Sequence, residues 1–95
     1  MAIFVHATLP GVTTDQYDAL NAELQKTPEI FAGCLSHACV PGDSGLEIYD
    51  LWESEEAMNK FTAAMMPVAE RSGMPAGPGG GPTISQVHNY WVPGA

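Results

Sequence analysis

The stretch LEIYDLWESEEA, from Leu46 to Ala57, changes its periodicity half-way along. Apolar residues alternate with others in its first half, which is typical of a β-strand with two distinct faces. Ser54 can then accept a hydrogen bond as the N-cap of a helix, and Glu55 and Glu56 would lie at the positive end of the helix dipole. The stretch therefore predicts a strand from Leu46 to Glu53 that runs directly into a helix.

Three elements are predicted before this junction. A strand with alternating apolar residues is followed by a helix that opens with a capping box, in which Thr13 is the N-cap and Gln16 lies three residues later. An extended run and a turn come next. The predicted segments are the strand Ala2 to Leu9, a helix from Thr13 closed by Pro28, the strand Ile30 to Val40, and the turn Pro41 to Gly45.

Three further segments are predicted after the junction. The second helix has an apolar stripe made of Met58, Phe61, Met65 and Val68. Pro67 is expected to kink or restart that helix, because proline removes a helical hydrogen bond. Residues Gly73 to Pro82 are almost entirely glycine and proline, and we expect either a mobile lid or a tolerated connection. A final strand is predicted from Thr83 to Val92.

The predicted order β-α-β-β-α-β indicates one α+β domain over residues 1–95. Right-handed crossovers then give a four-stranded antiparallel sheet in the strand order 4-1-3-2, with both helices on one face. The other face would be uncovered and too apolar to remain in water. Charged residues make up only 15% of the chain, which also favours an apolar interface. We therefore expect a homodimer.

Charge excludes two classes of partner. Three basic residues stand against eleven acidic ones, which gives a net charge of -8. Such a chain repels nucleic-acid phosphates and anionic membranes. No apolar run approaches the roughly 18 residues of a membrane helix, and the N-terminus lacks a basic region and cleavage site. We therefore expect a cytoplasmic location.

The two cysteines are expected to be small, buried thiols. Cys34 and Cys39 lie five residues apart in one predicted strand, so the alternation of a strand would point them to opposite faces. They could not form a disulfide within that strand. Their spacing also matches no zinc-binding pattern.

Asp50 requires a partner if the predicted strand is buried on one face. It shares that face with Leu46, Ile48 and Trp52, and an unpaired buried carboxylate is costly. The few basic residues lie on the helices, so His37 on the adjacent strand is the nearest candidate. A slip of one residue in the strand register would separate the two. A carboxylate-oriented imidazole can act as a general base, and it can equally be a structural hydrogen bond.

Polar side chains occupy both faces of the predicted last strand. His88 shares one face with Tyr90, and Asn89 shares the other with Trp91. One face could line a pocket below the helices, and the other could lie in the interface between two protomers. His88 is thus a candidate base, or else a core or interface histidine. Histidines on three strands also suggest a metal, but they show no close ligand spacing, so no metal site is predicted.

Several strings resemble the dimeric α+β barrel superfamily, and more closely its antibiotic biosynthesis monooxygenase branch. These strings are LPGVTTDQYDAL, SHACVPGDSGLEIYDLWESEEA and the late VHN. The strand-to-helix junction DLWESEEA is the most specific of them. The resemblance implies a ferredoxin-like protomer, a homodimer, and a pocket between sheet and helices. Its members include cofactor-free oxygenases of aromatic polyketides or quinols, haem-degrading enzymes, cyclases and isomerases.

Two departures from the resemblance affect the expected chemistry. Many quinol-oxidising relatives have a histidine on the second helix where this chain has Phe61. The haem-degrading branch needs an asparagine, a tryptophan and a histidine at positions that are approximately Phe4, Phe61 and Arg71 here. Haem degradation is therefore disfavoured, and the chemistry would have to come from the strands.

The function that these observations predict is a cofactor-independent monooxygenase, or a related cyclase or isomerase, of an apolar aromatic or polyketide-like molecule. His88 or His37 would be the base, with Asp50 as the orienting carboxylate. No flavin or metal is needed if the substrate carbanion reacts directly with oxygen. A non-catalytic dimeric module that binds a small ligand, or none, is the alternative. The predicted substrate contacts are Phe4, Trp52, Phe61, Asn89 and Tyr90.

Overall fold

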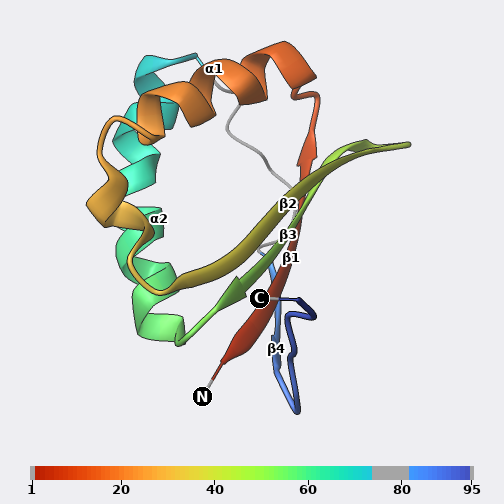
Figure 1. Cartoon of the computed structure of the whole chain (residues 1–95). Helices are drawn as coiled ribbons and strands as arrows, with labels where there is room; N and C mark the ends of the chain where they lie inside the picture. Colours follow the sequence, from red (N-terminus) through yellow and green to blue (C-terminus); the bar gives the residue numbers. More distant parts are fainter. Residues whose placement is uncertain (1, 74–81, 95) are drawn as a thin grey trace.

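The computed structural model describes residues 2–73 and 82–94, and the elements follow the predicted order (Figure 1). The strands form one antiparallel sheet in the order β2-β3-β1-β4, and α1 and α2 lie on the same side of it. This α+β arrangement confirms the predicted fold class and strand order. The elements are β1 Ile3–Pro10, α1 Thr14–Leu24, the 3-10 helix η1 Pro28–Phe31, β2 Cys34–Gly42, β3 Gly45–Trp52, α2 Glu55–Arg71 and β4 Thr83–Gln86.

The last strand is much shorter than predicted. β4 ends at Gln86 and not at Val92, because its partner β1 begins at Ile3, the residue opposite Gln86. The amide of Val87 donates one more hydrogen bond, 3.1 Å long, to the carbonyl of Ala2. A strand continues only where a neighbour can pair with its backbone groups. The chain beyond Val87 therefore leaves the sheet.

The hairpin between β2 and β3 is also tighter than predicted. The predicted turn from Pro41 to Gly45 shrinks to Asp43 and Ser44, because Gly42 already pairs with Gly45. The beginning of the predicted second strand, at Ile30, instead belongs to η1. A two-residue hairpin loop fixes the register of both strands, and this register determines which side chains of β2 face the helices.

Both helices begin as the sequence predicts. Thr13 and Gln16 form the capping box of α1, and the hydroxyl of Ser54 accepts a hydrogen bond from the amide of Ala57 at 3.1 Å. Of the kink or restart expected at Pro67, the restart was wrong, since α2 runs from Glu55 to Arg71 with that proline inside it. Within residues 2–73 and 82–94, no helix has the length and apolar character needed to cross a membrane.

The core lies between the sheet and the helices. Alternate residues of β1 and β3 are buried against α1 and α2, whereas the opposite side of the sheet is partly exposed, with Phe4 at 41% and Val40 at 45%. Asp50 is the buried charged residue of this interior. The apolar residues buried on the helix side are Ile3, Val5, Leu20, Leu24, Leu46, Ile48, Trp52 and Met58.

Both cysteines face the helices, so the prediction that they point to opposite faces was wrong. Cys34 pairs with Trp52 and Cys39 pairs with Ile48, two residues on the same side of β3. The register shifts between Cys34 and Ser36, which leaves Leu35 as the extra residue of a β-bulge. Such a bulge cancels the odd spacing of the two thiols. Both cysteines are free.

Gly45, at the start of β3, is a position where we expect a substitution to be costly. Its φ is +138°, and an added Cβ would lie 2.4 Å from the carbonyl oxygen of Leu9 and 2.9 Å from Cα of Pro10. Both contacts are to backbone, which cannot move aside easily. Gly45→Ala is therefore expected to lower the free energy of unfolding by about 2–3 kcal/mol, measured by urea denaturation.

Gly11→Ala is the matched control for that substitution. Gly11 also has a positive φ, +76°, but an added Cβ would meet nothing within 4 Å. Gly11→Ala should therefore lower the free energy of unfolding by only about 1 kcal/mol, the cost of placing a Cβ in a left-handed conformation. Equal losses of stability for the two variants would contradict the proposed clash at Gly45.

Candidate functional site

A cavity of about 260 Å³ lies between the sheet and the helices. Its walls are predominantly apolar and come from β1, β2, β3, η1, α1 and α2. Small-molecule pockets in proteins typically have volumes of about 300–1,000 Å³. This cavity lies just below that range, so its volume suits only a small ligand. Among the apolar residues that line it are Val5, Leu20, Leu24, Trp52, Met58 and Phe61.

A chain of hydrogen bonds runs along one wall of this cavity. His37 lies opposite Asp50 in the register of β2 and β3, and its Nδ1 is 2.5 Å from Oδ1 of Asp50. The indole Nε1–H of Trp52 donates to the other carboxylate oxygen at 3.3 Å. The hydroxyl of Tyr17, on α1, is hydrogen-bonded to Nε2 of His37. One carboxylate, one imidazole and one phenol are thus connected in series.

The donors and acceptors in this chain follow from the chemistry of its members. An ionised carboxylate only accepts hydrogen bonds, so Nδ1 of His37 carries the ring proton and donates a hydrogen bond to Asp50. In a neutral imidazole Nε2 then has a free lone pair, and it accepts a hydrogen bond from the hydroxyl of Tyr17. This arrangement keeps His37 in the tautomer that a general base requires.

Asp50 is more deeply buried than the histidine it pairs with. Its side chain is 13% exposed, and that of His37 is 39% exposed. The lysines cannot serve Asp50, because Lys26 and Lys60 pair with glutamates on the helix surfaces. The partner of the buried carboxylate is therefore the histidine on the neighbouring strand, and the predicted hydrogen bond between His37 and Asp50 is formed.

The phenol of Tyr17 should ionise unusually late. Burial is the largest cause, and Cys39, Asp50 and Asp18 act in the same direction, so that together they raise its pKa from 10.0 to about 12. Burial is also the main cause that raises the pKa of the Cys34 thiol, which lines the same cavity. Both groups therefore stay protonated near neutral pH.

An alkaline titration tests this assignment for Tyr17. One of the three tyrosines should ionise near pH 12 in the ultraviolet absorbance of phenolate, and Tyr17→Phe should remove that late step. The folded pKa lies above the ordinary value of 10.0, so the stabilising contribution is complete below pH 10 and is lost as the pH rises toward 12. Retention of the late step in Tyr17→Phe would contradict the assignment.

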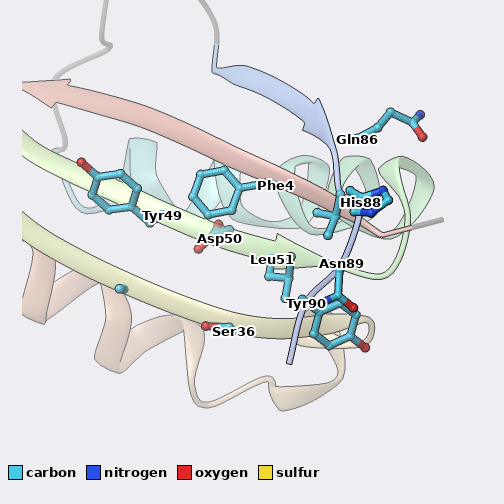
Figure 2. Close-up of a pocket in the computed structure, with 11 residues that line it drawn as sticks. Phe4, Ser36, Tyr49, Asp50, Leu51, Gln86, His88, Asn89 and Tyr90 are labelled. Carbon is cyan, nitrogen blue, oxygen red and sulfur yellow. The ribbon is translucent and has the colours of Figure 1, made fainter. Parts of the chain in front are cut away.

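The sequence-predicted site residues are divided between the two faces of the sheet. The helix-side cavity contains His37, Asp50, Trp52 and Phe61. A second hollow, of about 540 Å³, lies on the other face. Figure 2 shows His88, Asn89 and Tyr90 there, beside Phe4 and residues of the strands.

The early end of β4 explains this division. The predicted faces of His88, Asn89 and Tyr90 assumed a strand through Val92, but after Val87 the chain lies over the side of the sheet that the helices do not cover. His88 is exposed there. In this chain His88, Asn89 and Tyr90 therefore line a different hollow from the one that holds His37.

His6 also lies on the face away from the helices. Its Nε2 is 2.9 Å from Oε1 of Glu47, and its ring stacks on Tyr49 with centroids 4.7 Å apart. The three histidines do not converge, and in the described part of the chain no three His, Cys, Asp or Glu side chains are grouped as metal ligands.

Tyr17 is the site residue that sequence reasoning missed. It precedes Leu20 and Leu24 by three and seven residues, a spacing that by itself indicates only an apolar stripe packed against the core. The available signal was its hydroxyl, because a tyrosine in an otherwise apolar stripe needs a hydrogen-bond partner when it is buried.

No protein-family model and no curated protein matches this chain. A solved structure, that of Rv0793 from Mycobacterium tuberculosis, is similar over 97% of this chain and 96% of that chain. The sequence identity is 17% and the TM-score is 0.47. Similarity at this level assigns neither an activity nor a ligand, so function has to be argued from the site.

Proposed function

We propose that this chain is a small-molecule enzyme in which His37 removes a proton from a bound apolar substrate. The observation that carries the proposal is the hydrogen bond between His37 and Asp50 beside a cavity between sheet and helices. The carboxylate orients the ring and stabilises the imidazolium that forms when the proton arrives. The motifs around DLWESEEA support membership of the dimeric α+β barrel superfamily, as a relative of the antibiotic biosynthesis monooxygenases.

The substrate is an aromatic molecule of one or two rings with an acidic proton. The walls are apolar, and the rings of Trp52 and Phe61 lie 5.3 Å apart at the cavity, where they can pack against a flat ligand. The cavity volume of about 260 Å³ favours a quinol or a small polyketide fragment over a large polycyclic molecule.

The proposed reaction is cofactor-independent oxygenation. His37 takes the proton, and the electron-rich anion attacks molecular oxygen through carbon. A carbon–oxygen bond forms, the oxygen accepts the electron pair, and the resulting peroxide takes a proton from the imidazolium. Loss of the proton on the carbon that bears the peroxide, with cleavage of the O–O bond, gives a ketone or quinone, and the outer oxygen leaves as one water. Oxygen is the only oxidant in this sequence.

A cyclase or isomerase shares the first of these steps. In that case the anion is reprotonated or attacks within the substrate, and no oxygen is consumed. A non-catalytic module that binds a small ligand would use the same cavity without proton transfer. Three measurements distinguish these alternatives. An oxygenase consumes oxygen, a cyclase or isomerase exchanges carbon-bound protons with deuterated water without consuming oxygen, and a binding module shows binding alone.

The assay uses a panel of small hydroquinones, naphthols and anthrone-type carbon acids without added flavin or metal. Oxygen uptake or proton exchange is expected with the wild-type protein, and His37→Ala should lower the rate by about 10²–10⁴-fold. His6→Ala is the matched control, because His6 also pairs with a carboxylate but lies outside the cavity. Equal rates for His37→Ala and the wild type would refute the proposal.

We also propose that the protein is a homodimer through the uncovered face of the sheet. Phe4 and Val40 are partly exposed on that face, and Trp91 and Val92 are 79% and 57% exposed in the segment after β4. Exposed apolar groups of this size favour association. Light scattering at several protein concentrations measures the assembly, and a monomer at all of them would contradict it.

A further inference from the structure

The proposed base has no free lone pair in this structure. Nδ1 of His37 donates a hydrogen bond to Asp50, and Nε2 accepts a hydrogen bond from the hydroxyl of Tyr17. The rings of Tyr17 and His37 are nearly parallel, with an interplanar angle of 5° and centroids 6.0 Å apart. A substrate proton can reach Nε2 only if Tyr17 moves away or if the proton passes through the tyrosine oxygen.

The chemistry of a phenol favours passage through Tyr17. Its hydroxyl oxygen donates one hydrogen bond and retains lone pairs that can accept another. Tyr17 lines the cavity together with His37 and Asp50, so a hydroxyl group of a ligand can donate to this oxygen. The tyrosine then connects the ligand to the imidazole without leaving its place.

The groups that face Tyr17 oppose a lasting negative charge on it. Burial is the main cause that raises the pKa of the phenol, and Cys39 on β2, Asp50 on β3 and Asp18 on its own helix act in the same direction. Tyr17 must therefore receive a proton as it gives one. Proton transfer through it would be concerted, and the tyrosine would be neutral before and after.

We propose that Tyr17 is a catalytic residue that relays the hydroxyl proton of a phenol or enol substrate to His37. The inference rests on the proposed function and narrows its substrate class to molecules that present an acidic O–H group. In the relay the substrate O–H bond breaks and its proton binds the oxygen of Tyr17. The original proton of Tyr17 moves to Nε2 of His37. The products are a substrate anion, a neutral tyrosine, and an imidazolium beside the carboxylate of Asp50.

The test uses 4-nitrophenol, a single-ring phenol whose protonated and ionised forms absorb at different wavelengths. It is bound at saturation to the full chain at a pH below the pKa of the free probe. The wild-type protein is expected to hold the probe partly as phenolate, stabilised by the Tyr17 hydroxyl and the imidazolium. In Tyr17→Phe the probe should still bind, but its ratio of phenolate to phenol should fall about tenfold or more, because a hydrogen bond to a charged oxygen is lost.

Two controls separate the relay from a structural role of the tyrosine. Tyr49→Phe removes a phenol from the opposite face and should leave the ionisation of the probe unchanged. The ¹⁵N chemical shift of Nε2 of His37 should move to that of imidazolium when the probe binds to the wild type, and it should not move in Tyr17→Phe.

The outcomes distinguish the relay from the proposed function. Equal or greater ionisation of the probe in Tyr17→Phe would overturn the relay and leave His37 as a base that substrates reach directly. Absence of binding or of ionisation in the wild type would overturn both. Loss of ionisation in Tyr17→Phe, with binding retained, supports the relay.

Discussion

Asp50→Asn is expected to slow proton abstraction by about 10²–10⁴-fold, because it should reverse the tautomer of His37. The indole N–H of Trp52 only donates, so it will hold the carbonyl oxygen of an asparagine at position 50. The asparagine NH₂ group then faces Nδ1 of His37, which must become an acceptor. The ring proton moves to Nε2, and the lone pair needed by a base is lost.

The tautomer of His37 can be measured by ¹⁵N NMR without any substrate. Wild-type protein should carry the ring proton on Nδ1 and Asp50→Asn should carry it on Nε2. Adding Trp52→Phe to Asp50→Asn removes the indole donor, so the asparagine is free to turn its oxygen toward His37 and restore part of the wild-type population. An unchanged tautomer in Asp50→Asn would contradict the role assigned to the Trp52 hydrogen bond.

Trp52→Ala is expected to lower the free energy of unfolding by about 3–5 kcal/mol. Trp52 is 1% exposed and packs with Ile3, Val5 and Met58 in the core cluster. Its removal leaves a cavity and also removes the donor to Asp50. The free energy of unfolding of a native domain is only about 5–15 kcal/mol. The variant should therefore retain little stability and unfold at moderate temperature.

Urea denaturation followed by circular dichroism measures this loss, and Trp52→Phe is the graded control. Phenylalanine keeps an aromatic ring against Phe61 but lacks the indole N–H, so it should cost less than half as much as alanine. A loss below about 1 kcal/mol for Trp52→Ala, typical of surface positions, would contradict the view that this residue anchors the core.

Part of the site was predictable from local pattern. The alternation through β3 places Asp50 on the face of Leu46, Ile48 and Trp52, and the scarcity of basic residues made a histidine its most suitable partner. The choice of His37 needed the register, which the two-residue loop between Gly42 and Gly45 decides. Sequence could name the pair, but a slip of one residue would have placed the two side chains on opposite faces.

Other parts of the site depended on contacts between distant segments. Tyr17 lies on α1, and its hydroxyl meets a side chain on β2 that is far from it in sequence. His88 was assigned a strand face because the residues around it alternate. Alternation alone does not keep a segment in a sheet, however, and β1 offers no backbone partner beyond Ala2.

Local patterns in the chain were enough to predict the order of the strands and helices, the caps at Thr13 and Ser54, and the burial of a carboxylate at position 50. These features depend on residues within a few positions of one another, which periodicity and capping patterns report directly. Contacts between distant segments bring Tyr17, His37 and Asp50 together at one cavity and put His88 on the other face of the sheet. Those placements follow from strand register and from where a neighbouring strand begins, and both are set by pairing between segments that are remote in the chain.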